Sequence, residues 1–209
     1  MNNNIKAIIF DMDGVLIDAK EWHYEALNRA LGLFGFSINR YEHLVTFDGL
    51  PTRDKLTMLT KDRGLPIGLH SVINSLKQKY TMEIVHRECK PMFHHEYALS
   101  QLKAQGYKLA LASNSVRNSV KIMMEKCGLD QFLDTMISNE DVTKGKPDPE
   151  MYLKVAEILK VDPAQCLVVE DNENGIKSAT SAGCNVMVVN NVFDVTLENI
   201  NRELTPLNS

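Results

Sequence analysis

The sequence predicts an α/β protein: a doubly wound, Rossmann-like parallel sheet with a smaller all-helical domain inserted into it. Two observations lead to this fold class. Short apolar runs alternate with longer helical patterns over most of the chain, and one region near its start has helical patterns without a convincing strand. With 209 residues, of which 44% are hydrophobic, the chain is long enough to bury a core of this kind.

Five short apolar segments, several of them rich in valine and isoleucine, are predicted to be buried parallel strands. They are residues 5–10, 108–112, 136–137, 166–169 and 186–189. Three helical patterns fit the crossover connections between such strands. The segment 116–127 ends at Gly128, 149–159 begins with a proline suited to a first helical turn, and 175–182 ends at Gly183.

Residues 19–87 interrupt this alternation. Helical patterns at 21–33, 53–62 and 69–86 are separated there by turns that contain glycine or proline. We therefore predict an α/β catalytic core formed by residues 1–18 and 88–209, with a helical domain at 19–87. A domain inserted directly after the first strand is expected to act as a lid or cap over the site. The last residues, 205–209, are expected to fray.

Composition excludes several classes of function. The net charge of −4 comes without a basic stripe, so nucleic acid is not expected as a partner. No apolar run of about 18 residues suggests a membrane helix, and the polar start lacks the hydrophobic region of a signal peptide, which predicts a cytoplasmic protein. The four cysteines are widely spaced, which favours reduced thiols over a metal cluster or a disulfide framework.

Asp11 and Asp13 follow the first predicted strand and precede Gly14, and this pattern is typical of an active site. Because side chains alternate along a strand, the two carboxylates leave its end on the same side, and the glycine permits a sharp turn. Two carboxylates held together repel each other, so the pair predicts a metal ion, a shared proton, or both. Taken alone, the motif is also compatible with two aspartates that cap a helix.

Three further groups of residues lie where predicted core strands end. Ser113 and Asn114 open a helix and could hold an anion with a hydroxyl and backbone N–H groups, although taken alone the segment is also a common helix N-cap. Lys146 lies in a proline-flanked turn, where its cation could neutralise a phosphoryl group or crowded carboxylates, although a solvated loop lysine explains it equally well. Glu170 and Asp171 end an apolar strand as adjacent acids, which are suitable oxygen ligands for Mg²⁺.

These four segments, in this order, resemble the haloacid dehalogenase-like phosphohydrolase superfamily. The helical insertion after the first segment is similar to that of the β-phosphoglucomutase-like branch. The aspartate pair with its glycine resembles the first motif of the superfamily, Ser113 the second, Lys146 the third, and Glu170 with Asp171 the fourth.

The resemblance implies a phosphatase that works through an aspartyl-phosphate intermediate. Asp11 would be the nucleophile, and Asp13 the general acid and base. Ser113, the backbone N–H of Asn114, and Lys146 would bind the transferring phosphoryl oxygens.

The resemblance also implies Mg²⁺ as the cofactor. Its ligands would be the Asp11 carboxylate, the Asp13 backbone carbonyl and Asp171, with Glu170 assisting directly or through water. The dehalogenases of the superfamily lack an acid at the position of Asp13, so we do not expect dehalogenation.

Two residues of the predicted cap bear on the substrate. His23 resembles the hinge histidine of the β-phosphoglucomutases, although a histidine packed on a helix face explains it equally well. Arg53 resembles the cap arginine that the mutases place against a second phosphate, and an exposed arginine at a helix start is the alternative. The spacing from glycine to Arg53 is one residue longer than in the mutases, and neither Lys77 nor Lys79 matches their cap lysine.

We therefore expect a Mg²⁺-dependent phosphatase that acts on a small phosphorylated metabolite, a sugar or polyol phosphate. A sugar-phosphate mutase of the β-phosphoglucomutase type is the alternative. A catalytically silent binding protein is a third reading, which the intact acidic and basic motifs oppose. The expected partner is the small metabolite, and the expected state is a monomer, with a dimer left open.

Overall fold

The computed structural model describes residues 4–47 and 49–208. The chain divides into two compact units. The first, here called the core unit, comprises Met1–Asp18 and Lys90–Ser209, and the second, here called the helical unit, comprises Ala19–Cys89.

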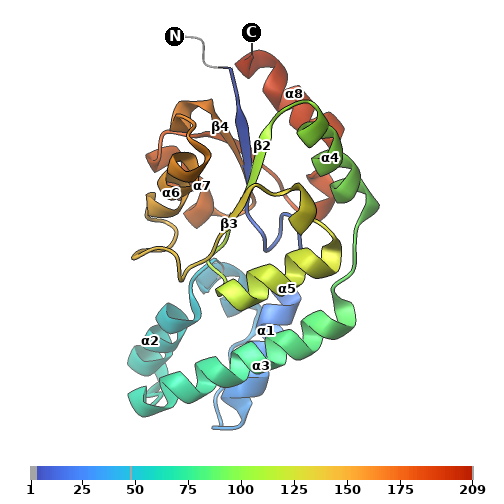
Figure 1. Ribbon diagram of the computed structural model, residues 1–209. Coiled ribbons are helices and arrows are strands. Elements are labelled where there is room, and N and C mark those ends of the chain that lie inside the picture. Colours follow the sequence, from blue (N-terminus) through green and yellow to red (C-terminus); the bar gives the residue numbers. More distant parts are fainter. Residues whose placement is uncertain (1–3, 48, 209) are drawn as a thin grey trace. The chain divides into compact units, whose positions relative to one another are not determined.

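The core unit contains a five-stranded parallel sheet in the order β3-β2-β1-β4-β5 (Figure 1). From β1 the chain builds outward to β3 on one side and to β5 on the other, so the order switches between β1 and β4. Ligands of such sheets bind beyond the carboxyl ends of the strands at this switch. The strands are β1 (Ala7–Phe10), β2 (Lys108–Ala112), β3 (Thr135–Ile137), β4 (Cys166–Glu170) and β5 (Asn185–Val188).

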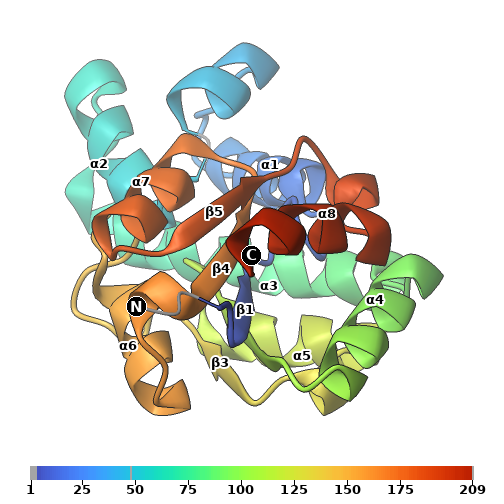
Figure 2. The same ribbon diagram turned by 90° about the horizontal axis from the view of Figure 1, so that it is seen from above.

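Helices cover both faces of the sheet, which confirms the predicted fold class. α6 and α7 lie on one face, and α4 and α8 lie on the other (Figures 1 and 2). Every residue of β1 is fully buried, as expected for a central strand covered on two sides. The helices of the core unit are α4 (Phe93–Ala104), α5 (Arg117–Cys127), α6 (Glu150–Leu159), α7 (Glu173–Ser181) and α8 (Leu197–Leu207).

The predicted fraying of the last residues is wrong for the part that the structure describes. α8 extends to Leu207, and the side chain of Asn208 ties the end of the chain to two other segments. Its Oδ1 accepts a hydrogen bond from the Ile5 N–H at 2.7 Å, and its Nδ2 donates to the Tyr107 hydroxyl at 3.1 Å.

The helical unit contains α1 (Lys20–Gly32), α2 (Thr52–Arg63) and α3 (His70–Glu88), and its described residues form no strand. α1 packs against α3 over an apolar core to which α2 contributes Leu56 and Leu59. α2 ends at Gly64, whose φ of 69° is the left-handed conformation that glycine adopts without strain. Nowhere in the described parts of either unit does a helix combine the length and apolar character needed to cross a bilayer.

His95 is a buried histidine on α4 with a specific backbone partner. Its Nε2 donates to the Val192 carbonyl at 2.8 Å, and only 1% of the residue is exposed. Burial lowers the pKa of His95 from its ordinary value of 6.5 to about 4, against the opposing effect of this hydrogen bond and with a further contribution from His94. His95 is therefore neutral at physiological pH in the folded protein.

We predict that His95 makes folding stability depend on pH between about 6.5 and 4. In this window the unfolded chain binds a proton at His95 and the folded chain does not, so the free energy of unfolding falls as the pH falls, by up to about 3 kcal/mol. Urea denaturation at a series of pH values should show a smaller fall for His95→Gln, which can keep the bond to Val192. His86→Gln, at an exposed site, should behave as wild type. Identical pH profiles for wild type and His95→Gln would contradict the assignment.

Candidate active site

Asp11 and Lys146 form a buried ion pair at the carboxyl end of β1. The Asp11 N–H donates to the Val169 carbonyl at 3.0 Å, so the residue continues the pairing of β1 with β4. Its side chain meets the ammonium of Lys146, whose Nζ donates to Asp11 Oδ1 at 2.6 Å, to Glu170 Oε1 at 2.6 Å and to the Ala112 carbonyl at 2.8 Å. Asp11 is 5% exposed and Lys146 3%, so a single buried cation joins the ends of β1, β2 and β4.

Glu170 is fully buried and held by donors on both carboxylate oxygens. Oε1 accepts from Lys146 and from the Tyr152 hydroxyl at 2.7 Å. Oε2 accepts from the Asp171 N–H at 3.1 Å and from Asn172 Nδ2 at 3.2 Å. Because four donors meet this one carboxylate, its position and that of the adjacent Asp171 are fixed together.

The residues present fit a divalent cation. Asp11, Glu170 and Asp171 each offer a carboxylate oxygen, and these three oxygens lie within 4.8 Å of one another. Carboxylate oxygens are the ligands that Mg²⁺ prefers. When ionised, the three carboxylates and the Lys146 ammonium sum to a charge of −2, which one divalent cation would neutralise.

Asp13 lies at the start of a tight turn and contacts a serine beyond β2. Its Oδ2 accepts a hydrogen bond from the Ser115 hydroxyl at 2.9 Å. Gly14 has a φ of 94°, and its N–H donates to the Ile17 carbonyl at 2.7 Å, which closes the turn. The glycine of the first motif is thus needed for its backbone conformation, as predicted.

Ser113 and Asn114 lie directly after β2 and have different neighbours. Ser113 is buried, and its Oγ accepts from the Ser115 N–H at 3.0 Å. The Asn114 side chain bonds the backbone of Lys146 on both sides: Oδ1 accepts from its N–H at 3.0 Å, and Nδ2 donates to its carbonyl at 3.2 Å. Asn114 therefore fixes the backbone of the loop that carries Lys146. These contacts bring together the core residues that the sequence analysis selected, namely Asp11, Asp13, Ser113, Asn114, Lys146, Glu170 and Asp171.

The electrostatics of the cluster favour a protonated lysine among crowded carboxylates. Burial raises the pKa of Asp11, and the Glu170 and Asp13 carboxylates raise it further, against the opposing charge of Lys146. Burial by itself would lower the pKa of Lys146, but the Asp11 and Glu170 carboxylates outweigh it and raise that pKa. A further positive charge close to Asp11 would offset the repulsion and favour its ionised, nucleophilic form.

His23 and Arg53 both belong to the helical unit. His23 lies on α1, half-buried, with its Nδ1 3.2 Å from the Nζ of Lys77 on α3. The Arg53 side chain is 86% exposed at the start of α2, and its Nε lies 3.3 Å from Oδ1 of its neighbour Asp54. Residue 48, in the loop that carries the resemblance to the mutase arginine, lies outside the described residues.

Sequence reasoning missed several residues that position the site. Ser115 and Asn172 lie inside the motif segments, so their position and short polar side chains could have predicted contacts with the motif carboxylates. Tyr152 gave no signal, because an aromatic residue at helical spacing is ordinary core. Gly175 lies in α7 where a Cβ atom would overlap the carboxylate of Glu170, which only the folded structure reveals.

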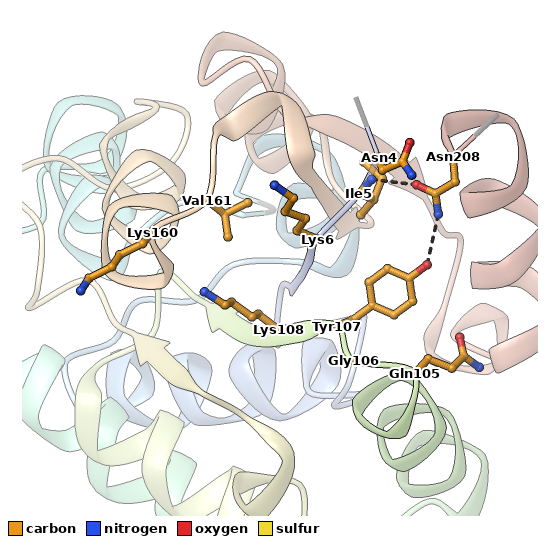
Figure 3. Close-up of a pocket in the computed structure, with 10 residues that line it drawn as sticks. All are labelled: Asn4, Ile5, Lys6, Gln105, Gly106, Tyr107, Lys108, Lys160, Val161 and Asn208. Carbon is orange, nitrogen blue, oxygen red and sulfur yellow. Dashed lines mark hydrogen bonds between the residues drawn. The ribbon is translucent and has the colours of Figure 1, made fainter. Parts of the chain in front are cut away.

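A separate pocket of about 400 Å³ opens elsewhere on the core unit, at the amino ends of β1 and β2. Lys6, Lys108 and Val161 line it, together with the bonded pair Tyr107 and Asn208 (Figure 3). This pocket lies at the opposite ends of β1 and β2 from Asp11 and Ser113. The four motifs converge at the acidic cluster instead, and none of the described residues that line this pocket carries a carboxylate side chain.

Comparisons with known proteins agree with this geometry. A family model described as "Haloacid dehalogenase-like hydrolase" matches residues 8–189. A "Phosphorylated carbohydrates phosphatase" from Thermotoga maritima is 32% identical, over 86% of this chain and 82% of its own length. A "Beta-phosphoglucomutase" from Bacillus subtilis is 29% identical, over 95% of both chains. Among solved structures, a beta-phosphoglucomutase from Clostridium difficile superposes with a TM-score of 0.84 at 22% identity, covering 97% of this chain and 98% of its own.

The chain belongs to the haloacid dehalogenase-like hydrolases. The resemblance to the haloacid dehalogenase-like superfamily drawn from the four motifs is thereby confirmed. The similarity to beta-phosphoglucomutases is consistent with the predicted branch. The prediction of an enzyme of the phosphatase class is confirmed as well.

We predict that Gly175→Ala disrupts the site by displacing Glu170. The new methyl group would overlap the carboxylate that Lys146 and Tyr152 hold, so the variant should lose about 1–3 kcal/mol of unfolding free energy, measured by urea denaturation. Gly32→Ala is a matched control, because its helical glycine faces open space; it should be neutral or up to about 1 kcal/mol more stable. If Gly175→Ala and Gly32→Ala had the same unfolding free energy, the Glu170 side chain would be able to move aside without a loss of stability.

Proposed function

We propose that this protein is a Mg²⁺-dependent phosphatase that hydrolyses a small phosphorylated metabolite through a phosphorylated Asp11. One observation carries the proposal: the Asp11 carboxylate is buried, with a lysine ammonium at 2.6 Å and two further carboxylates within 4.8 Å. This arrangement presents a carboxylate nucleophile beside a fixed cation and a set of oxygen ligands for a second cation.

In the first step, an Asp11 oxygen attacks phosphorus, and the bond between phosphorus and the substrate oxygen breaks. Asp13 would donate a proton to the departing oxygen. In the second step, Asp13 would take a proton from the water that attacks the aspartyl phosphate, which releases inorganic phosphate and regenerates Asp11. The hydrogen bond from Ser115 orients the Asp13 carboxylate for both transfers.

Charge stabilisation at the phosphoryl group would come from Ser113, the backbone N–H of Asn114, and Lys146. All three ammonium protons of Lys146 already have acceptors, so its main contribution is a fixed positive charge beside the reacting oxygen.

Mg²⁺ would be held by the carboxylates of Asp11 and Asp171 and the backbone carbonyl of Asp13, with Glu170 beside them. When bound, the ion would supply charge neutralisation for the phosphoryl oxygens.

We propose a sugar or polyol phosphate as the substrate class. The support is a relative at 32% identity that carries the name phosphorylated carbohydrates phosphatase. Arg53 and His23 are the proposed substrate-selecting residues of the helical unit. The exposed guanidinium of Arg53 forms only a weak surface pair with Asp54, so it can bind a phosphate or sugar at little cost.

A sugar-phosphate mutase is the second candidate, favoured by the 29% identity to a beta-phosphoglucomutase along almost the whole chain. A mutase would return the phosphoryl group from Asp11 to a sugar hydroxyl instead of to water. Incubation with glucose 1-phosphate and a trace of glucose 1,6-bisphosphate separates the two. Accumulation of free phosphate supports the phosphatase, and accumulation of glucose 6-phosphate supports the mutase.

We predict that Asp11→Asn lowers phosphate release by about 10⁴-fold or more, because the amide has no nucleophilic oxygen anion. The measurement is a phosphate-release assay with Mg²⁺ against a broad panel of phosphorylated metabolites, in which wild type should hydrolyse at least one sugar or polyol phosphate. Asp18→Asn, the same change at an exposed position, should retain full activity. An active and folded Asp11→Asn protein would refute the covalent mechanism.

A further inference from the structure

Cys166 and Cys184 lie opposite each other on neighbouring parallel strands. Cys166 is the first residue of β4, and Cys184 directly precedes β5. The register pairs Leu167 with Asn185, so one step earlier it sets the two cysteines side by side, with their side chains on the same face. Asn185 Nδ2 also donates to the Cys166 carbonyl at 3.3 Å, which holds the two strand starts together.

This placement meets the distance requirement of a disulfide. Neighbouring strands lie about 4.8 Å apart, and disulfides join Cα atoms that are about 4.4–6.8 Å apart. Both side chains pack against the apolar cluster that includes Tyr152 and Val168.

The two thiols differ in exposure and in chemistry. Cys166 is fully buried, whereas Cys184 is partly exposed. A hydrogen bond from the Cys184 thiol lowers the pKa of Cys166, against the effect of burial, and the same bond together with burial raises the pKa of Cys184. The partly exposed residue Cys184 therefore lies beside the buried Cys166, whose thiolate character is enhanced, which is the arrangement of an entry residue and a resolving thiol.

We propose that Cys166 and Cys184 form a reversible disulfide, and that a low-molecular-weight disulfide such as oxidised glutathione is the oxidant. The site is independent of the phosphatase chemistry. It lies at the amino end of β4, and Glu170 lies at the carboxyl end of the same strand.

The reaction balances in two exchanges. The raised pKa of Cys184 keeps most of it in the thiol form, so its thiolate fraction attacks oxidised glutathione slowly. This attack forms a mixed disulfide and releases one glutathione thiolate. The Cys166 thiolate then attacks the Cys184 sulfur, which forms the protein disulfide and releases the second glutathione thiolate. The two protein thiols are oxidised, one glutathione disulfide is reduced to two thiols, and the two cysteine protons pass to the leaving thiolates.

The test is peptide mapping of the folded wild-type protein after treatment with excess oxidised glutathione, followed by alkylation of the remaining thiols and trypsin digestion without reductant. Cleavage after Lys160, Lys177 and Arg202 places the two cysteines in separate peptides, 161–177 and 178–202. We expect most of the protein to yield these two peptides joined, about 2 Da lighter than their summed masses. Excess reduced glutathione should separate them again.

Two variants sharpen the result. Cys89→Ser combined with Cys127→Ser should still give the joined peptides, and Cys184→Ser should give none. The proposal is overturned if both cysteines stay alkylated as free thiols in saturating oxidised glutathione, if oxidation stops at glutathione attached to Cys184, or if reduced glutathione cannot reopen the bond. The mass of the joined peptides identifies a disulfide between Cys166 and Cys184 directly. The wild-type experiment therefore tests the proposal even if a variant fails to fold.

Discussion

The rest of the active site depends on the buried ammonium of Lys146. It bonds Asp11, Glu170 and a backbone carbonyl at the end of β2, and so it links three strand ends that are far apart in sequence. Removing one partner of a buried pair costs about 3–5 kcal/mol, because the remaining charge is left uncompensated. In the proposed mechanism the same charge lies beside the phosphoryl group that is transferred, so one interaction would serve both stability and catalysis.

The sheet could be predicted well because its strands are buried on both faces. Continuous apolar runs mark such strands without any knowledge of their partners, and each predicted strand overlaps an observed one. The sequence did not predict α4 or α8. α4 contains the adjacent histidines His94 and His95, and the second of these is buried with a hydrogen bond to the carbonyl of Val192, 97 residues away in the sequence. The ordered end of α8 depends on a bond between Asn208 and Ile5, 203 residues apart, which no local pattern contains.

The site was predictable to the extent that its residues lie within motifs. Asp11, Lys146 and Glu170 were selected from strand ends and residue type, and the structure brings their side chains into contact. The residues that position them were not predicted, since Tyr152 and Gly175 matter only through the approach of α6 and α7 to Glu170. The roles of His23 and Arg53 rest on resemblance, because substrate recognition does not follow from the fold.

The most direct test of the central claim is detection of the phosphoryl group on Asp11. Acetyl phosphate suits the first step, because its leaving group needs no proton, and Asp13→Asn removes the base for the second. After brief mixing with Mg²⁺ and an acid quench, we expect tryptic peptide 7–20 to be about 80 Da heavier, with the added mass on Asp11. If wild type releases phosphate while this peptide stays unmodified in both proteins from the earliest time points, Asp11 is not the nucleophile.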